Sequence, residues 1–354
     1  MKAAHQREGS GSESLFPSRR PALTRQGQRL GTLVIDAEED FDWTKPAPDT
    51  WRSTESIRHV GQLHQILGSY GIVPAYLLTF PVLQDDEAVR ILRDLRDREK
   101  CVLGIQLHTW VTPPFGERWS REQSFAANID LALEERKLLS LRGMFIERFG
   151  YAPTVFRSGR YGLSHGTAGL LESHGFTIDT SIAPRTSFRA EGGPDFRAFD
   201  TEPFWFGRAR DLLELPLSRS VVGWGRRFAP LVYAAVPGND DDRSVMRSLL
   251  NRSRFAERIT LSPEGNDARA MRRLVDRSIA RGCNLLSLSF HSSSLHVGNN
   301  PYVRSHRDLR VFYDRLSSIL DYMTGACGFE FVAIDKMPGL IVPPTPLVLE
   351  PLIS

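Results

Sequence analysis

Five carboxylates crowd into seven positions near the start of the chain, directly after a short apolar run. The stretch is TLVIDAEEDFDW, residues 32–43, and its acidic members are Asp36, Glu38, Glu39, Asp40 and Asp42. Like charges this close repel, and they stay together only where a cation, an arginine or protonation relieves the repulsion. We therefore expect a positively charged group beside this stretch, whereas a solvated turn is enough to explain at least two of its acids.

Polar side chains with chemical uses follow further apolar runs along the chain. They are His108 after LGIQL, Arg157 after TVF, Asp179 after FTI, Glu214 in LLELP and His291 after LLSLSF. Any one of them could be a satisfied buried polar residue, which is the usual fate of a lone histidine or glutamate. Together they predict a shared site, because the carboxyl ends of the strands of a parallel α/β barrel converge on one mouth.

Carboxylates and imidazoles that meet in this way are typical ligands of zinc, manganese or similar divalent cations. The simplest interpretation of the acidic stretch is that Asp36 or Glu38 holds such a cation together with His108. Arg157 would keep Asp36 ionised and in place. His291 would supply a proton donor, because an imidazole titrates near working pH.

These residues need a scaffold that places strand ends side by side, and the sequence pattern provides one. From residue 32 onward, short β-rich runs alternate with longer amphipathic stretches. The helical stretch STESIRHVGQLHQILGSYG, residues 53–71, has capping residues at its start and a glycine at its end. Repeated β-α alternation predicts a parallel sheet, and seven or eight units favour closure into a barrel over an open sheet.

The chain divides into three predicted parts. Residues 1–29 are polar and lack periodicity, so we expect a disordered arm. Residues 30–338 form the predicted barrel domain, and the proline-rich residues 339–354 form a tail that we expect to pack as an extended strap. Two insertions, residues 185–211 and 221–244, are too long for ordinary connections and are interpreted as loops that cover the site.

Composition excludes several classes of function. The 354 residues include 45 basic and 42 acidic ones, a net charge of +3, and no basic stripe with interleaved aromatics, so a nucleic-acid partner is not expected. The three cysteines are far apart in sequence, which supports neither a disulfide framework nor a thiolate zinc site. No apolar run approaches the ~18 to 20 residues of a membrane span. We therefore expect a soluble, cytoplasmic protein, and the sequence leaves its oligomeric state open.

The ordered motifs resemble those of a known family. The chain resembles the NodB-like polysaccharide deacetylase superfamily (carbohydrate esterase family 4), particularly its WalW-like members, over residues 32–337. The matching segments, in order, are VIDAEEDFDW, VLGIQLHTWVTPPF, FRSGRYGLS, GFTIDTSIAP, LLELPLS and LSFHSSSLHVGNNPYV. The resemblance implies a distorted (β/α)7-type barrel that removes acetyl groups from sugars with a bound divalent metal ion, for which zinc is our prediction.

Carried over residue by residue, the resemblance assigns five roles. It implies that Asp36 is the catalytic base and that Arg157 orients it. His291 would be the general acid. Glu38 and His108 would be metal ligands.

Four further residues are predicted to lie on the substrate side of the site. Trp43 is a candidate platform for a sugar ring, since aromatic faces stack on sugars. Trp110 follows His108, and Asp179 opens the DTS segment that the resemblance assigns to supporting the site. Glu214 completes the set.

The metal motif departs from the family pattern. Members usually carry two histidines four residues apart, but His108 is followed at that spacing by Thr112. If the frame is shifted, Gln106 replaces the first histidine and Trp110 the second. Candidates to fill the missing position are Glu39, Asp42, Gln106 and water; otherwise the metal is absent and the protein inactive.

Two alternatives to a deacetylase therefore stay open. The first is a carbohydrate-binding protein on the same fold that does not turn its ligand over, a reading motivated by the incomplete histidine pair. The second is a glycoside hydrolase, in which Glu38 or Glu39 faces Glu214 as the carboxylate pair.

Overall fold

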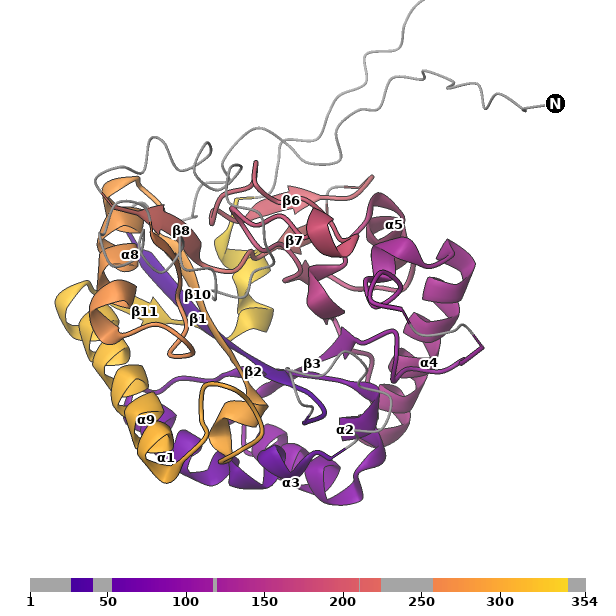
Figure 1. Cartoon of the computed structure of the whole chain (residues 1–354), viewed down its shortest axis with the longest axis horizontal. Coiled ribbons are helices and arrows are strands. Elements are labelled where there is room, and N and C mark those ends of the chain that lie inside the picture. Colours follow the sequence, from indigo (N-terminus) through magenta and orange to yellow (C-terminus); the bar gives the residue numbers. More distant parts are fainter. Residues whose placement is uncertain (1–26, 41–52, 117–119, 210, 224–256, 343–354) are drawn as a thin grey trace, which may run out of the picture.

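A curved, mostly parallel sheet runs through the molecule, with helices around its outer face (Figure 1). The structure, a computed structural model, describes residues 27–40, 53–116, 120–209, 211–223 and 257–342. Within these residues the nine strands of the sheet follow the order β10-β1-β2-β3-β4-β5-β7-β6, with β11 added to β1. The strands are β1 (Arg29–Ala37), β2 (Ala75–Leu78), β3 (Val102–Leu107), β4 (Val155–Ser158), β5 (Ile178–Asp179), β6 (Phe204–Phe206), β7 (Leu212–Glu214), β10 (Leu285–His291) and β11 (Phe329–Phe331).

Helices connect the parallel strands, as the alternating sequence pattern predicts. They are α1 (Val60–Ser69), α2 (Phe80–Gln84), α3 (Asp86–Asp97), α4 (Leu131–Phe149), α5 (His165–Ser173), α8 (Ala268–Ala280) and α9 (His306–Asp321). Aspartates cap several of them: the side chains of Asp85, Asp130 and Asp267 accept backbone N–H groups of the first turns of α3, α4 and α8. Such caps satisfy backbone donors that have no partner within the helix.

Irregular backbone spans the gap between the two ends of the sheet. β8 (Arg219–Val222) and β9 (Glu257–Thr260) form a separate antiparallel pair. Leu261, directly after β9, joins this pair to β10, because its carbonyl accepts the backbone N–H of Ser289 at 3.1 Å. The sheet is thus a half-barrel whose opening is crossed by short strands, which confirms the predicted distorted (β/α)7-type barrel.

Alternate residues of each strand face two different cores. Leu33 and Ile35 of β1 belong to the large apolar cluster that includes the helices, so they mark the outer face of the sheet. Leu30 and Val34 belong to a smaller cluster made mainly of strand residues inside the curve. Asp36 continues this inner series, because successive strand residues alternate between the two faces. The inner face therefore carries apolar side chains together with the small polar residues Thr32, Ser287 and Ser289, and ionisable side chains where the strands end.

The predicted part boundaries lie close to the edges of the described structure. β1 begins at Arg29, one residue before the predicted start of the barrel. At the other end Ile341 is buried, and the indole of Trp205 donates to the carbonyl of Val342 at 3.1 Å. The predicted arm up to residue 26, most of the 221–244 insertion and the tail from residue 343 lie outside the described residues.

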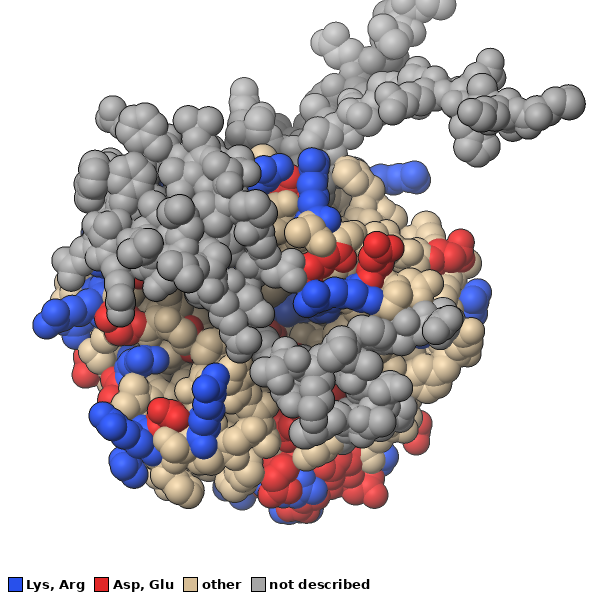
Figure 2. Space-filling view, viewed as in Figure 1, with Lys and Arg blue, Asp and Glu red and all other residues tan. Residues whose placement is uncertain are grey.

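Charges of both signs are interspersed over the coloured part of the face in Figure 2. The three cysteines, Cys101, Cys283 and Cys327, are buried free thiols. None of the helices in the described ranges combines the length and the apolar character that crossing a membrane requires.

Candidate active site

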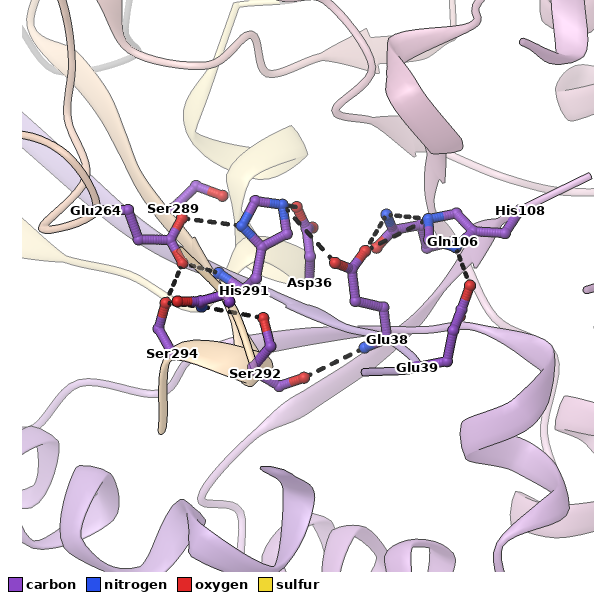
Figure 3. Close-up of polar contacts among 12 residues, drawn as sticks. Asp36, Glu38, Glu39, Gln106, His108, Glu264, Ser289, His291, Ser292 and Ser294 are labelled. Atoms are coloured by element: carbon purple, nitrogen blue, oxygen red, sulfur yellow. Dashed lines mark hydrogen bonds and ion pairs between the residues drawn. The ribbon is translucent and has the colours of Figure 1, made fainter. Parts of the chain in front are cut away.

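Inner-face side chains from several strand ends meet at one rim (Figure 3). The sheet register explains why: Asp36 of β1 pairs with His291 of β10, and Gln106 of β3 pairs with Arg157 of β4. His108 lies directly after β3, again on the inner side. The structure thus brings together all five residues to which the sequence assigns catalytic or metal-binding roles.

One part of the rim, the acid–base half, consists of Asp36, Arg157, His291 and Glu264. Asp36 and Arg157 are both buried and form an ion pair, in which Nη1 of Arg157 lies 2.5 and 2.7 Å from the two carboxylate oxygens. Nε of Arg157 donates to the hydroxyl of Thr180 at 2.9 Å, which fixes the plane of the guanidinium. A buried carboxylate next to a fixed guanidinium is held in one orientation, as an oriented base requires.

His291 is held by Glu264, which accepts from it twice. Nδ1 of the ring lies 2.9 Å from one Glu264 oxygen, and the backbone N–H of His291 donates to the other at 3.0 Å. Nε2 then points toward Asp36, 3.6 Å from its Oδ2. Burial opposes the charged ring, but the negative charges of Glu264, Glu38 and Asp36 outweigh it and raise the pKa of His291 to about 10. The ring is therefore protonated at neutral pH and can donate a proton.

Accessibility also favours His291 as the group that meets a substrate. Its side chain is 19% exposed, whereas those of Asp36 and Glu38 are 3% exposed. The imidazole thus lies nearest to solvent among these groups, and the carboxylates lie behind it.

The other part of the rim, the amide half, consists of Glu38, Glu39, Gln106, His108 and Trp110. Nδ1 of His108 lies 2.8 Å from Glu39, which also accepts the indole N–H of Trp110 at 3.0 Å. The Trp110 ring stacks on His108 with centroids 4.2 Å apart. Nε2 of Gln106 lies 2.9 Å from Nε2 of His108 and 3.3 Å from Oε2 of Glu38.

Protonation in the amide half is set by burial and hydrogen bonding. Burial, reinforced by Asp36 and Glu39, raises the pKa of Glu38 to about 8 despite the nearby histidines, so this carboxyl is neutral at pH 7. For His108 two influences conflict: Glu39 overcomes burial and raises the pKa of the ring, whereas the Gln106 amide at Nε2 favours a ring without a proton there. Two N–H groups cannot face each other at 2.9 Å, so this contact fixes the neutral tautomer with its proton on Nδ1.

The predicted metal ligands do not fit a metal ion in this arrangement. Oε2 of Glu38 and Nε2 of His108 are 3.4 Å apart, but an amide N–H donor, not a third lone pair, faces both of them. Among the described residues, no group of three or more His, Cys, Asp or Glu side chains could hold an ion. Asp42, one candidate for the missing ligand, lies outside the described residues.

Asp179 and Glu214 lie away from the rim. They are paired in neighbouring strands, in register with the outer-face residue Phe156 rather than with Arg157. Both are fully buried, and burial is the largest influence that raises the pKa of each. This placement argues against direct contact with a substrate. Their assignment as substrate-binding residues stays a prediction, and Trp43 lies outside the described residues.

Sequence reasoning missed three residues that shape the rim. Glu264 lies four residues after the end of β9, whose sequence ERIT contains a single apolar residue, so the rule that found the other strand-end residues does not find it. Lys137 of α4 is fully buried and donates to the carbonyls of Thr109, Thr112 and Pro114, which anchors the loop after His108. A lysine on an amphipathic helix gives no sign of such a role, because most are exposed.

Gly159, after β4, allows the amide half to pack closely. A Cβ at this position would lie 2.5 Å from Cδ2 of His108 and 2.5 Å from the Leu107 carbonyl. Any side chain would therefore displace His108, which explains the need for glycine here.

Comparisons with known proteins show the fold. No family model matches the chain, and neither does any curated protein. Among solved structures, Puue allantoinase superposes with a TM-score of 0.55 at 13% identity, covering 94% of this chain and 97% of that one. A protein assigned as a polysaccharide deacetylase from Mycobacterium smegmatis gives 0.52 at 14% identity, with 93% and 98% covered. One from Pseudomonas aeruginosa PAO1 gives 0.51 at 14%, with 88% and 89% covered.

Proposed function

We propose that the protein is a hydrolase that removes an N-acetyl group from a sugar of a surface polysaccharide or its precursor. The acid–base half carries this proposal. Asp36 and a protonated His291 face each other across 3.6 Å, each backed by its own buried counter-charge. Amide hydrolysis needs a base and an acid held next to each other at one site.

In the proposed reaction, Asp36 takes a proton from a water molecule as its oxygen attacks the acetyl carbonyl carbon. A tetrahedral intermediate forms, the C–N bond breaks, and His291 gives its Nε2 proton to the leaving amine. Acetate and a free amino sugar are the products. Arg157 holds Asp36 in its orientation, and Glu264 accepts from Nδ1 of His291 and stabilises the doubly protonated ring, whose second proton is on Nε2.

A bound divalent cation would polarise the acetyl carbonyl and lower the pKa of the attacking water. Zinc was the predicted ion, with Glu38 and His108 as its ligands. Because these side chains are not arranged for an ion, no step is assigned to one.

The structural neighbours support the reaction class at the level of the fold. Two are assigned as polysaccharide deacetylases, and a third is an allantoinase. Allantoin therefore belongs in the substrate panel beside acetylated sugars. Membership of the WalW-like subgroup and a cytoplasmic location stay predictions.

The structure bears differently on the two alternative functions. The glycoside hydrolase needs Glu214 opposite Glu38 or Glu39, but Glu214 is fully buried beside Asp179. The argument for a carbohydrate-binding protein without catalytic activity still holds, since the amide half lacks a second imidazole. It predicts sugar binding without release of acetate.

Acetate release tests the proposal. Purified protein is incubated with N-acetylated chitooligosaccharides, peptidoglycan fragments and, separately, allantoin, and products are quantified beside the His291→Ala variant. We expect acetate from an amino-sugar substrate with wild type and a large loss with the variant. Sugar binding without acetate release, measured by calorimetry on the same preparations, would support the binding protein instead.

A further inference from the structure

The Gln106 amide lies between the two atoms that the sequence assigns to a metal ion (Figure 3). Its nitrogen is 2.9 Å from Nε2 of His108 and 3.3 Å from Oε2 of Glu38, and these two atoms are 3.4 Å apart. One donor group thus serves both predicted ligands. These are hydrogen-bond distances, which are longer than the ~2.0 to 2.2 Å of zinc bonds to nitrogen and oxygen.

The contacts of Glu39 explain why His108 needs a donor at this position. Glu39 accepts from Nδ1 of His108 and from the indole of Trp110, which leaves a lone pair on Nε2. A buried lone pair is costly unless a hydrogen-bond donor or a cation faces it. The Gln106 amide is the donor that faces it.

Burial and strand register hold Gln106 in this place. Its side chain comes from the inner face of β3, where its Cα pairs with that of Arg157 in β4. Glu38, Gln106 and His108 are all nearly fully buried. Two residues before Gln106, a Cβ at Gly104 would lie 2.6 Å from the Val155 carbonyl, so only glycine fits at this point of the contact between β3 and β4.

We infer that the Gln106 amide takes the place of a divalent cation between Glu38 and His108, so that the wild-type protein binds no stoichiometric metal ion there. A positively polarised N–H replaces the positive ion and satisfies both side chains by hydrogen bonding. Gln106 then has a structural role, and this role explains why the metal motif departs from the family pattern. We also expect that chelators leave the rate of turnover unchanged. This expectation rests on the proposed deacetylation, whereas the metal content does not.

Metal content tests this assignment without any measurement of turnover. Wild type and Gln106→His are dialysed against chelator, incubated with zinc, freed of excess metal and analysed by plasma mass spectrometry. We expect less than ~0.1 zinc per wild-type chain and about one per chain in Gln106→His, where a second imidazole replaces the amide. The double variant Gln106→His, His108→Ala should lose this zinc.

A matched control and a second probe sharpen the experiment. Gln65→His adds an imidazole at an exposed position of α1 and should bind no more zinc than wild type. Cobalt, whose visible spectrum reports bound imidazole, should give a ligand-field band with Gln106→His only. About one zinc per wild-type chain, lost in His108→Ala, would overturn the assignment. So would a folded Gln106→His protein, verified by circular dichroism, that takes up no ion.

Discussion

The two halves of the rim arise from the same strand ends, yet they balance their buried charges in different ways. In the acid–base half each full charge meets an opposite one, Asp36 with Arg157 and His291 with Glu264. In the amide half a neutral amide bridges Glu38 and His108. The comparison shows that two separate sets of contacts lie within one rim: the first pairs each charge with an opposite one, and the second is arranged around the Gln106 amide.

Removal of His291 should have the largest effect on turnover. His291→Ala deletes the proton donor for the leaving amine, and loss of a general acid lowers kcat by about 10²- to 10⁴-fold. Acetate release under saturating sugar measures it. The His108→Ala variant, which alters the amide half, should lose clearly less. Equal losses of turnover in the two variants would show that the acid–base half and the amide half do not act separately.

Arg157→Met should have the largest effect on stability. It leaves Asp36 buried without its counter-charge, and breaking a buried pair costs about 3 to 5 kcal/mol of unfolding free energy. Denaturant unfolding followed by circular dichroism measures this loss. Arg90→Met is the control, because Arg90 forms an exposed pair with Glu87 on α3, and solvent screens such pairs so that they contribute little to stability. A similar loss in both variants would contradict the assigned importance of the buried pair.

Lys137→Met should destabilise the amide half to a smaller extent. Three carbonyls of the loop after His108 lose their shared donor, and unsatisfied buried groups of this kind cost about 1 to 3 kcal/mol. Denaturant unfolding measures the loss, and Lys100→Met, at an exposed lysine, provides the control. The pH dependence of turnover should stay unchanged, because none of these three hydrogen bonds involves His291. A shifted pH profile would show that the halves are coupled.

Glu264→Gln should change the pH dependence of turnover more than its maximum. The folded-state pKa of His291 is raised, so the proton needed for catalysis is present at lower pH and lost as pH rises through about 10. Without the negative charge of Glu264 this pKa falls, and the alkaline limb of kcat/KM against pH moves to lower pH. A limb that stays in place would mean that His291 is not the titrating acid.

The sequence predicted the meeting of Asp36, His108, Arg157 and His291 for a physical reason. An apolar run that ends in a polar residue marks a strand end, and parallel strands bring such ends to one rim. Asp179 and Glu214 also follow apolar runs, but the sheet register pairs them with Phe156 rather than with Arg157, and a shift of one residue turns a side chain to the other face of the sheet. Which face a residue takes depends on register, and a run of consecutive apolar residues does not reveal register.

Other features depend on contacts that no local pattern encodes. Glu264 contacts His291 across 27 residues of the sequence, from the segment that follows β9, a strand outside the main sheet. The position of the Gln106 amide depends on the side chains of Glu38 and His108, which come from different strands. The sequence showed that a histidine was missing, and the structure shows which group stands in its place.

The most direct test of the account is acetate release by chelator-treated protein, measured with and without added zinc, beside Asp36→Asn. We predict equal rates from wild type in both conditions, within about two-fold, and a loss on the order of 10²-fold or more in the variant. Release that appears only after zinc is added would contradict the account, and so would its absence in both conditions.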